Sequence, residues 1–319
     1  MDNSQVEIIA AASGTIIDKH DGEYDRNCVS NNLTANYVIL QHADGTRTLY
    51  WHMKSGKVTN KAIGQTVIAG EYLGVVGSSG SSSGPHLHFE VWTGSTNTTY
   101  IDPFSGTCNT VSLTSKWIAQ KPYTEPAVIK ASIHTTDYTP PACGITETLN
   151  ESNVYVIPFH GTSLAPGYAK FCAFLRNPTS GGIVNLKITD ASATEYLSWT
   201  YTIASTNKSS FFQLSKKLPT TSGVYTYTAT YNGVACSQNF EIRTCAENYN
   251  AWNGTTSSDW GTPTNWSCGT VPTNATNVII YSGVPNNPIV GSNAECKSLK
   301  AFPSGNVKVN TGFSLKVFK

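Results

Sequence analysis

Residues 83–90 read SGPHLHFE and place two histidines, His86 and His88, two positions apart within an apolar run. In a β-strand the side chains of residues i and i+2 point to the same face, so the two imidazoles are expected to project together. Leu87 and Phe89 then fall on the opposite face as predicted core. An HxH pair is a weak signal by itself, because two such histidines also occur on ordinary polar sheet faces.

The segments around the pair strengthen the prediction of a site. A loop of small residues, SSGSSSG at 78–84, leads into the strand expected over His86–Trp92 and leaves room for a substrate chain. A third histidine, His52, ends the strand expected over Thr48–His52, and functional residues are often found where strands end. Glu90 shares the face of the two histidines and is a candidate to orient one of them, as carboxylates beside metal-binding histidines do.

Short apolar runs separated by turn residues predict an all-β chain with little helix. In 225–231, YTYTATY, aromatic and polar residues alternate with the period of a strand. Composition and the pattern of apolar runs divide the chain into three segments, residues 1–108, 128–244 and 245–319. Residues 109–127 have the composition of a linker. Strands are expected over Val6–Ala12, Tyr37–His42, Thr48–His52, Tyr72–Val76, His86–Trp92, Asn153–Ile157, Ala169–Leu175, Val184–Ile188, Leu197–Ile203, Gly223–Tyr231, Val278–Tyr281, Cys296–Ala301 and Val307–Val309.

Composition excludes several classes of function. The 319 residues carry a net charge of +1 and only 13% charged side chains, so there is no basic surface for nucleic acid. No window of about 18 apolar residues occurs, so no membrane span is expected. A chain rich in Ser, Thr and Asn and poor in charge is typical of exported proteins, which points to a secreted or cell-surface location.

Eight cysteines occur without any CxxC pair, which favours disulfides of an exported protein over a zinc ribbon. Cys268 and Cys296 are a plausible pair, although pairing cannot be deduced from sequence. The N-terminus, Met1-Asp2-Asn3-Ser4, lacks the features of a signal peptide.

Three stretches carry a family resemblance: GQTVIAGEYLGVVGSSGSSSGPHLHFEV (Gly64–Val91), NYVILQHADGTRTLYWHM (Asn36–Met53) and IIAAASGTI (Ile8–Ile16). Together they make residues 5–104 resemble the lysostaphin-like (LytM-like) zinc metalloendopeptidases. The resemblance implies an antiparallel β-sheet peptidase domain over 1–108. It also implies hydrolysis of peptide bonds, often in the cross-links of bacterial cell-wall peptidoglycan.

The resemblance also implies roles for individual residues. His88 becomes a ligand of a single Zn²⁺, and His86 and His52 become catalytic residues that place the attacking water and stabilise the developing oxyanion. Asn36 matches a family position near the substrate groove, but an asparagine at a strand start explains it equally well. His42 falls outside the catalytic pattern and is expected at the surface.

The chain departs from the family pattern in its metal ligands. Two further ligands, a His and an Asp in an HxxxD motif, are expected just ahead of Met1. Asp2 is nearest to the missing aspartate in sequence, and the loop KHDGEYDRN offers an alternative site. We expect that residues 1–319 begin at an internal methionine of a longer exported protein, and that Cys28 loses its disulfide partner with the missing segment. The candidate ligands there are His20, Asp21 and Asp25 in the loop and Asp18 directly before it.

The rest of the chain predicts two further β segments. Residues 128–244 favour an immunoglobulin-like β-sandwich, in which His134 and His160 are expected as surface residues. Residues 245–319 resemble the opening of β-solenoid repeats in adhesin-like secreted proteins.

Two functions remain open at this point. The first is a zinc endopeptidase acting on peptidoglycan. The alternative is a catalytically inactive domain that binds cell wall or a partner within a secreted adhesin-like protein. The oligomeric state is left open.

Overall fold

The structure is a computed structural model that describes residues 6–94, 99–106, 114–143, 152–159 and 164–318. Within these ranges strands dominate, with short 3-10 turns such as η2 (Cys245–Glu247) and η3 (Pro263–Asn265), which confirms the all-β prediction. No helix in the described ranges is long and apolar enough to cross a membrane. The chain divides into two compact units, unit 1 (Met1–Tyr123 with Pro141–Glu147) and unit 2 (Thr124–Pro140 with Thr148–Lys319).

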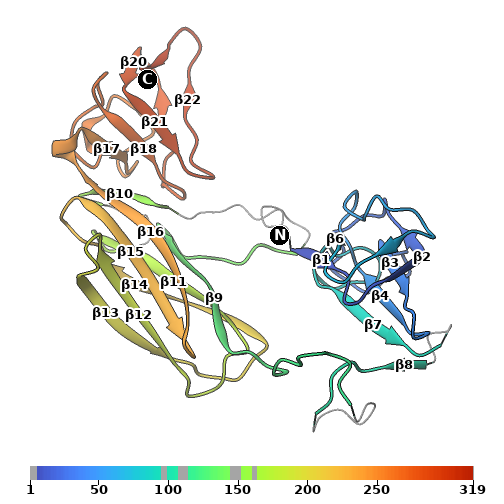
Figure 1. Ribbon diagram of the computed structural model, residues 1–319. Coiled ribbons are helices and arrows are strands. Elements are labelled where there is room, and N and C mark those ends of the chain that lie inside the picture. Colours follow the sequence, from blue (N-terminus) through green and yellow to red (C-terminus); the bar gives the residue numbers. More distant parts are fainter. Residues whose placement is uncertain (1–5, 95–98, 107–113, 144–151, 160–163, 319) are drawn as a thin grey trace. The chain divides into compact units, whose positions relative to one another are not determined.

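Unit 1 is built on a six-stranded antiparallel sheet in the order β5-β2-β3-β4-β7-β8 (Figure 1). A separate antiparallel pair, β1 with β6, contributes Ile8 and Leu73 to the same buried cluster as Val38 and Leu40 of β3. The strands are β1 (Glu7–Ile9), β2 (Gly14–His20), β3 (Tyr37–Gln41), β4 (Arg47–Trp51), β5 (Thr66–Val67), β6 (Tyr72–Val75), β7 (His88–Trp92) and β8 (Tyr100–Ile101).

The register between β4 and β7 decides which side chains face the core. Tyr50 is paired with Phe89, and Trp51 with His88. Because paired residues share a face and neighbours alternate, Tyr50 and Phe89 point to the core while Trp51 and His88 point away from it. We call the second surface the histidine face of the sheet.

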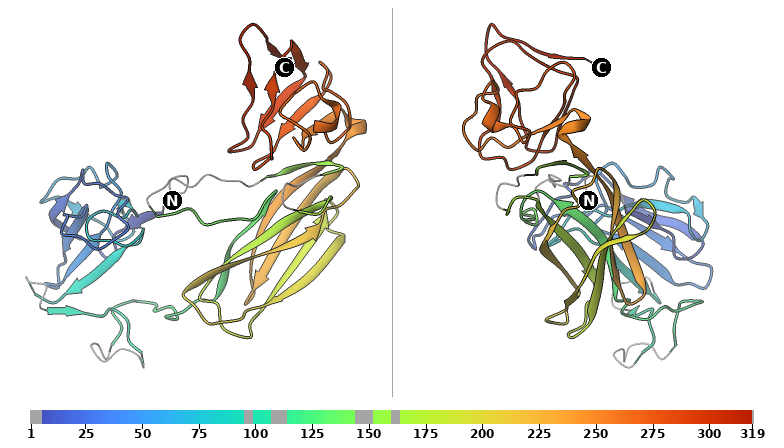
Figure 2. Two further views of the ribbon diagram at one scale, coloured as in Figure 1. Left: turned by 180° about the vertical axis from the view of Figure 1, so that it is seen from behind. Right: turned by 90° about the vertical axis from the view of Figure 1, so that its left-hand side faces the viewer.

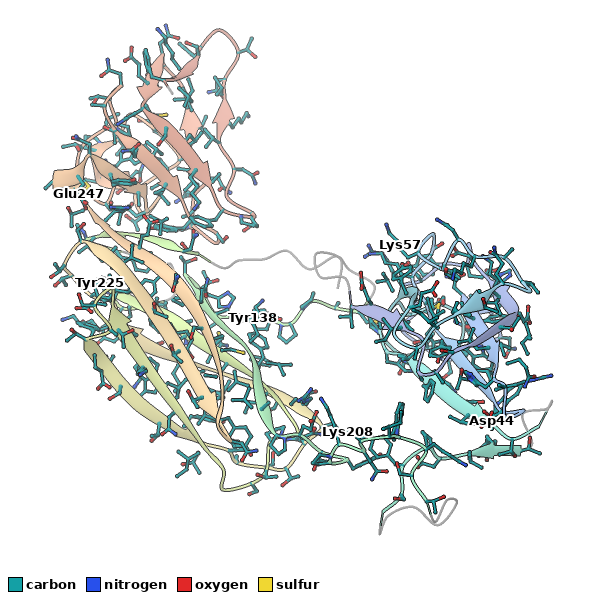
Figure 3. The ribbon with its side chains drawn as sticks, in the orientation of Figure 1. Asp44, Lys57, Tyr138, Lys208, Tyr225 and Glu247 are labelled. Carbon is teal, nitrogen blue, oxygen red and sulfur yellow. A yellow bond between two sulfur atoms is a disulfide. The ribbon has the colours of Figure 1, made fainter. Side chains whose placement is uncertain are left out.

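Unit 2 contains a β-sandwich, whose two sheets are seen from different sides in Figure 2. One sheet has the order β10-β16-β15-β12-β13 and the other β14-β11-β9. Large side chains fill the core, as shown by Tyr225, labelled in Figure 3, whose ring centroid lies 5.7 Å from that of Phe240. The immunoglobulin-like topology stays a prediction. The strands are β9 (Ala127–His134), β10 (Val154–Ile157), β11 (Tyr168–Arg176), β12 (Ile183–Asp190), β13 (Glu195–Thr202), β14 (Ser209–Lys217), β15 (Gly223–Tyr231) and β16 (Val234–Thr244).

The C-terminal strands of unit 2 pair in parallel, which is the arrangement of successive coils in a β-solenoid. A cluster of Trp252, Trp260 and Trp266 forms their core. These strands also pack on the sandwich, because the Val156 N–H donates to the Tyr281 hydroxyl at 2.8 Å. The strands are β17 (Tyr249–Trp252), β18 (Asn277–Ile280), β19 (Ile289–Val290), β20 (Ala294–Cys296), β21 (Ser298–Ala301), β22 (Lys308–Val309) and β23 (Leu315–Val317).

Two disulfide expectations are wrong. Cys28 does not lose its partner, because it is bonded to Cys143, 115 residues further along the chain. Cys268 is bonded to Cys245 rather than to Cys296. Cys296 is a fully buried thiol in the tryptophan-lined core of the C-terminal strands, where burial raises the pKa of the thiol. Cys296 therefore serves as an apolar core residue of β20 and not as a disulfide cysteine.

Candidate metal and catalytic centre

Three histidines come together where the β4–β7 pairing ends. His52 directly follows β4 with a left-handed backbone (φ 63°), His86 precedes β7, and His88 is the first residue of β7. The ring centroid of His52 lies 4.7 Å from that of His86 and 5.6 Å from that of His88. One ring nitrogen of each residue can be chosen so that the three atoms lie within 4.8 Å of one another. The three histidines singled out in the sequence thus form one cluster.

Each imidazole in the cluster has one nitrogen fixed by an oxygen acceptor. Nδ1 of His52 lies 2.6 Å from the Ser79 carbonyl oxygen, and Nδ1 of His86 lies 2.8 Å from that of Gly84. Nε2 of His88 lies 2.6 Å from Oε1 of Glu90. Carbonyl oxygens only accept hydrogen bonds, so these nitrogens carry the protons, and the other nitrogen of each ring keeps its lone pair. Such lone pairs bind metals or accept protons.

The imidazole of His88 is suited to act as one ligand of a zinc ion. Imidazole nitrogens bind Zn²⁺ at about 2.0–2.1 Å, which puts ligands of a tetrahedral site roughly 3.3 Å apart. The described cluster is wider than that, with separations of up to 4.8 Å. The spacing of the three rings therefore does not by itself make His52 and His86 ligands of the same metal. Glu90 also provides the acceptor that commonly fixes a metal-binding imidazole.

Glu90 connects the cluster to the strand that carries it. Its Oε1 accepts from His88, and its Oε2 accepts from the indole N–H of Trp92 at 2.6 Å. Both partners lie two residues from Glu90, on the same strand face. The carboxylate is thereby held in one orientation, which in turn fixes the ring of His88.

A set of buried hydrogen bonds holds the backbone segments next to His52 in place. The Ser79 hydroxyl donates to the Met53 carbonyl at 2.9 Å, and accepts from the Asn36 N–H at 2.9 Å. Gly77 donates its N–H to the His52 carbonyl, and an added Cβ at Gly77 would lie only 2.6 Å from the backbone nitrogen of Lys54. Only glycine fits this close approach of two backbone segments.

Asn36 is part of this support. The side chain is fully buried, accepts from the Glu23 N–H at 2.8 Å, and donates to the carbonyls of Glu23 and Met53 at 3.0 and 3.1 Å. Its amide is therefore committed to backbone partners. Of the two interpretations that the sequence left open, this geometry favours the structural one.

Burial lowers the pKa of His52, and the neighbouring His86 and His88 rings lower it further. The hydrogen bond to Ser79 acts in the opposite direction without reversing the shift. His52 therefore stays neutral to a lower pH than an ordinary histidine does.

The serine loop at 78–84 is more ordered than its composition indicates. Ser78, Ser79 and Ser82 are almost completely buried. The Ser78 hydroxyl donates to the Asn27 carbonyl at 2.7 Å, and the Ser82 hydroxyl to that of Gly84 at 2.8 Å. Ser79 was not singled out in the sequence, because its role depends on a backbone carbonyl and a buried hydroxyl, which leave no sequence pattern.

Two local expectations around the HxH pair are wrong. The strand begins at His88 rather than His86, because the N–H of His86 donates to the Gly77 carbonyl instead of to a neighbouring strand. Leu87 is 38% exposed and does not belong to the core. Phe89, in contrast, packs against the core as expected.

The alternative ligands in the loop KHDGEYDRN do not join the cluster. His20 pairs with Glu23 at 2.8 Å, and Asp18 accepts from the Tyr37 hydroxyl. Asp21 and Asp25 accept from backbone N–H groups at Gly56 and Ser55. Within the described ranges, the grouping of possible metal ligands contains the three histidines alone. Asp2 and His160 lie outside the described residues.

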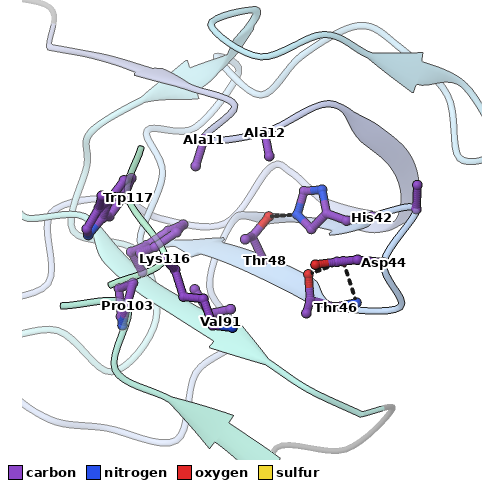
Figure 4. Close-up of a pocket in the computed structure, with 12 residues that line it drawn as sticks. Ala11, Ala12, His42, Asp44, Thr46, Thr48, Val91, Pro103, Lys116 and Trp117 are labelled. Carbon is purple, nitrogen blue, oxygen red and sulfur yellow. Dashed lines mark hydrogen bonds between the residues drawn. The ribbon is translucent and has the colours of Figure 1, made fainter. Parts of the chain in front are cut away.

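His42 and His134 are buried, so the prediction that they lie at the surface is wrong. Both ring nitrogens of His42 have partners, the Ser13 carbonyl and the Thr48 hydroxyl. His42 lines a cavity of about 360 Å³ together with Thr48, Val91 and Trp117 (Figure 4). Val91 and Thr48 are paired residues on the core side of the sheet, so this cavity is separate from the histidine cluster.

Residues 2–103 match the model of peptidase family M23. The N-terminal domain belongs to peptidase family M23. Its match includes all three histidines of the cluster. Residues 251–319 match a second family, a domain of unknown function named DUF8693.

Curated proteins are similar to parts of this chain. The cell division protein DipM of Caulobacter vibrioides is 42% identical over 86 residues, which are 26% of this chain and 13% of DipM. The peptidoglycan DD-endopeptidase ShyA of Vibrio cholerae is 41% identical over 56 residues, which are 18% of this chain and 12% of ShyA. The chain therefore spans only about an eighth of the length of these relatives.

A solved structure is also similar. The catalytic domain of lysostaphin from Staphylococcus simulans is 32% identical, with a TM-score of 0.25, and the match covers 32% of this chain and 69% of that domain.

Proposed function

We propose that the M23 domain is a zinc-dependent endopeptidase that hydrolyses peptide bonds in peptidoglycan cross-links. The observation that carries the proposal is the cluster of His52, His86 and His88, in which each ring has one nitrogen fixed and one available lone pair. The substrate class is supported by the similarity to ShyA, whose name describes a peptidoglycan DD-endopeptidase.

In this proposal His88 is a zinc ligand, and Glu90 fixes its ring. A His and an Asp expected ahead of Met1 would complete the ligand set. When bound, zinc polarises the scissile carbonyl and lowers the pKa of water toward about 7. His52 and His86 are not ligands but catalytic residues.

His52 and His86 would accept the proton of the attacking water and stabilise the negative charge that develops on the oxyanion. The lone pair on Nε2 of neutral His52 can accept a proton from the attacking water, because its Nδ1–H is held by Ser79. His86 has the same tautomer through Gly84. Once protonated, either ring can donate a hydrogen bond to the oxyanion or a proton to the leaving amine.

The test combines metal content with hydrolysis. The protein is purified with the residues expected ahead of Met1 included and is loaded with zinc, because residues 1–319 supply only His88 of the proposed ligand set. Bound zinc is quantified after removal of the excess. Release of peptide fragments from peptidoglycan is then measured with and without a chelator. About one zinc per chain and chelator-sensitive cleavage are expected. Peptidoglycan binding without zinc and without cleavage would contradict the proposal and favour the alternative, a cell-wall-binding domain that does not cut.

The location and the remaining domains belong to the same proposal. A peptidoglycan substrate places the protein outside the cytoplasm, as a secreted or cell-surface protein. Residues 128–244 would act as an immunoglobulin-like spacer or binding module, and residues 245–319 as an adhesin-like segment. The limits at 108, 127 and 244 stay predictions.

A further inference from the structure

An apolar pocket of about 370 Å³ adjoins the histidine cluster on the histidine face of the sheet. His52 and His88 line it. Trp51, the residue paired with His88, also lines it, and its ring centroid is 5.3 Å from that of His88. Tyr37 of β3 is a further lining residue, with its ring 6.4 Å from that of Trp51. Strand pairing thus builds the pocket and the candidate catalytic centre from the same residues.

The rim of the pocket comes from loops. The segment 33–35, directly before β3, provides Leu33 and Ala35, and the serine loop provides Ser81. Leu33 is 58% exposed, so an apolar side chain is held at the pocket entrance in contact with solvent. An apolar residue in this position would gain contacts if a ligand covered it.

The pocket is electrically neutral. None of its eight described lining residues is an Asp, Glu, Lys or Arg. Tyr37 donates its hydroxyl proton to Asp18, and burial and this bond raise the pKa of the phenol. A charged ligand group would lose hydration here without gaining a partner, whereas an apolar group would gain from burial.

We infer that this pocket binds an uncharged apolar side chain of the peptide substrate, and that Trp51 is the residue that determines this specificity. The inference rests on the proposed peptide hydrolysis. Consecutive residues of a peptide are about 3.8 Å apart at Cα, so a side chain on the Trp51 ring belongs to a residue next to, or one removed from, the scissile bond. A glycine at that position leaves the pocket unfilled, and a lysine places a charge in it.

The test is a binding measurement that does not depend on the metal. The probes are pentaglycine and two series of pentapeptides, in which a single leucine or a single lysine replaces glycine at each position in turn. Their affinities for the chelator-treated chain are measured by NMR titration of the tryptophan indole signals. One leucine position is expected to bind at least about tenfold more tightly than pentaglycine, and lysine at that position is expected to show no gain.

Two variants assign the preference to the pocket. Trp51→Ala is expected to reduce the leucine preference to less than about twofold. Leu33→Glu is expected to weaken binding of the leucine peptide, and it does not risk the fold because Leu33 is exposed. The matched control is Val29→Glu, which places the same charge on a residue that is 68% exposed and does not line the pocket. Val29→Glu should bind as the unchanged protein does.

The outcomes separate this inference from the proposed function. A leucine preference that is lost in Leu33→Glu, in a chain without zinc-dependent cleavage, would support the pocket and contradict the peptidase. Zinc-dependent cleavage with equal affinity for leucine and glycine peptides would overturn the pocket and leave the peptidase standing. Equal weakening by Leu33→Glu and Val29→Glu would also overturn the pocket.

Discussion

Both units of the chain contain a histidine held by a serine, and the two arrangements differ in what surrounds the ring. In unit 1, the Ser79 carbonyl holds His52, and two further imidazoles lie within ring-contact distance. In unit 2, the Ser132 hydroxyl lies 2.7 Å from Nε2 of His134, the last residue of β9. Ser132 is fully buried and His134 is 1% exposed, so no substrate can reach this pair.

The difference shows that a hydrogen-bonded histidine is not by itself a site. His134 packs against the Tyr138 ring, on the face of β9 opposite to the core residues Ala131 and Ile133. The cluster in unit 1 lies where β4 ends and β7 begins, and His86 there is exposed. Access and the presence of several lone pairs distinguish a candidate catalytic centre from a polar group that the core has enclosed.

The largest expected effects test the division of roles within the cluster. His88→Ala should remove zinc binding and all hydrolysis, because it removes a metal ligand. His52→Asn should keep zinc but lower kcat/KM by about 10²–10⁴, because it removes an acid–base group. Asparagine is chosen because it tolerates the left-handed backbone of this position. Zinc content and peptide hydrolysis provide the measurement, with both variants made in the protein that includes the ligands expected ahead of Met1.

A histidine in unit 2 supplies the matching control. His134→Gln should lower the free energy of unfolding by about 1–3 kcal/mol, because a buried hydrogen bond is disturbed, and leave hydrolysis per folded molecule unchanged. Equal loss of zinc in His52→Asn and His88→Ala would contradict the assigned roles.

The next largest effect concerns the support behind His52. Asn36→Ala removes three hydrogen bonds between a fully buried amide and the backbone. Its expected cost is about 2–3 kcal/mol of unfolding free energy, because backbone groups lose their partners. Hydrogen exchange of the β3 and β4 amides in urea measures it. Asn31→Ala, in an exposed loop of the same unit, should cost less than about 0.5 kcal/mol. Similar costs for the two variants would show that Asn36 does not support the site.

A smaller effect is expected at the carboxylate that fixes His88. Glu90→Gln keeps the shape of the side chain but loses its charge, so zinc affinity should fall about 10–100-fold. The control is Glu23→Gln, because Glu23 forms a similar carboxylate–imidazole pair with His20 outside the cluster. Competition with a chromogenic chelator measures both affinities. If Glu90→Gln binds zinc as tightly as Glu23→Gln does, Glu90 has no role in positioning the ligand.

The sequence predicted five strands of unit 1, β1, β3, β4, β6 and β7, because alternation of apolar and polar residues depends on one sheet face being buried. The expected Tyr37–His42 differs from β3 by one residue at one end, and Thr48–His52 differs from β4 by one residue at each end. The strands β2, β5 and β8 were not among the expected ones. Alternation predicted that His86 and His88 project together, and the family resemblance assigned His52 to the same site. Neither could place His42, because the burial of that ring depends on Thr48 across the hairpin and on Ser13 from a distant turn.

Interactions between residues far apart in sequence escaped prediction for the same reason. The bond between Cys28 and Cys143 joins segments 115 residues apart, and no local pattern marks either cysteine. Ser79 supports His52 through its carbonyl group, which every residue possesses. Sequence patterns therefore indicated which side chains carry chemistry, while the groups that hold them in place became visible only in the folded chain.

The smallest expected effect is the pH dependence that His52 gives to stability. Its pKa in the folded chain is lowered below the ordinary value of 6.5 by burial and by two neighbouring imidazoles. Below pH 6.5 the unfolded chain therefore binds a proton that folded His52 does not, so the contribution is present above pH 6.5 and is lost as the pH falls toward the lowered pKa. One proton limits the slope to about 1.4 kcal/mol per pH unit. Urea unfolding of chelator-treated protein between pH 5 and pH 8 should show a shallower acid decline in His52→Asn than in the unchanged chain. His20→Asn, which alters a half-buried imidazole outside the cluster, should keep the full decline. Identical pH profiles for His52→Asn and the unchanged chain would mean that the cluster does not hold His52 in its neutral form.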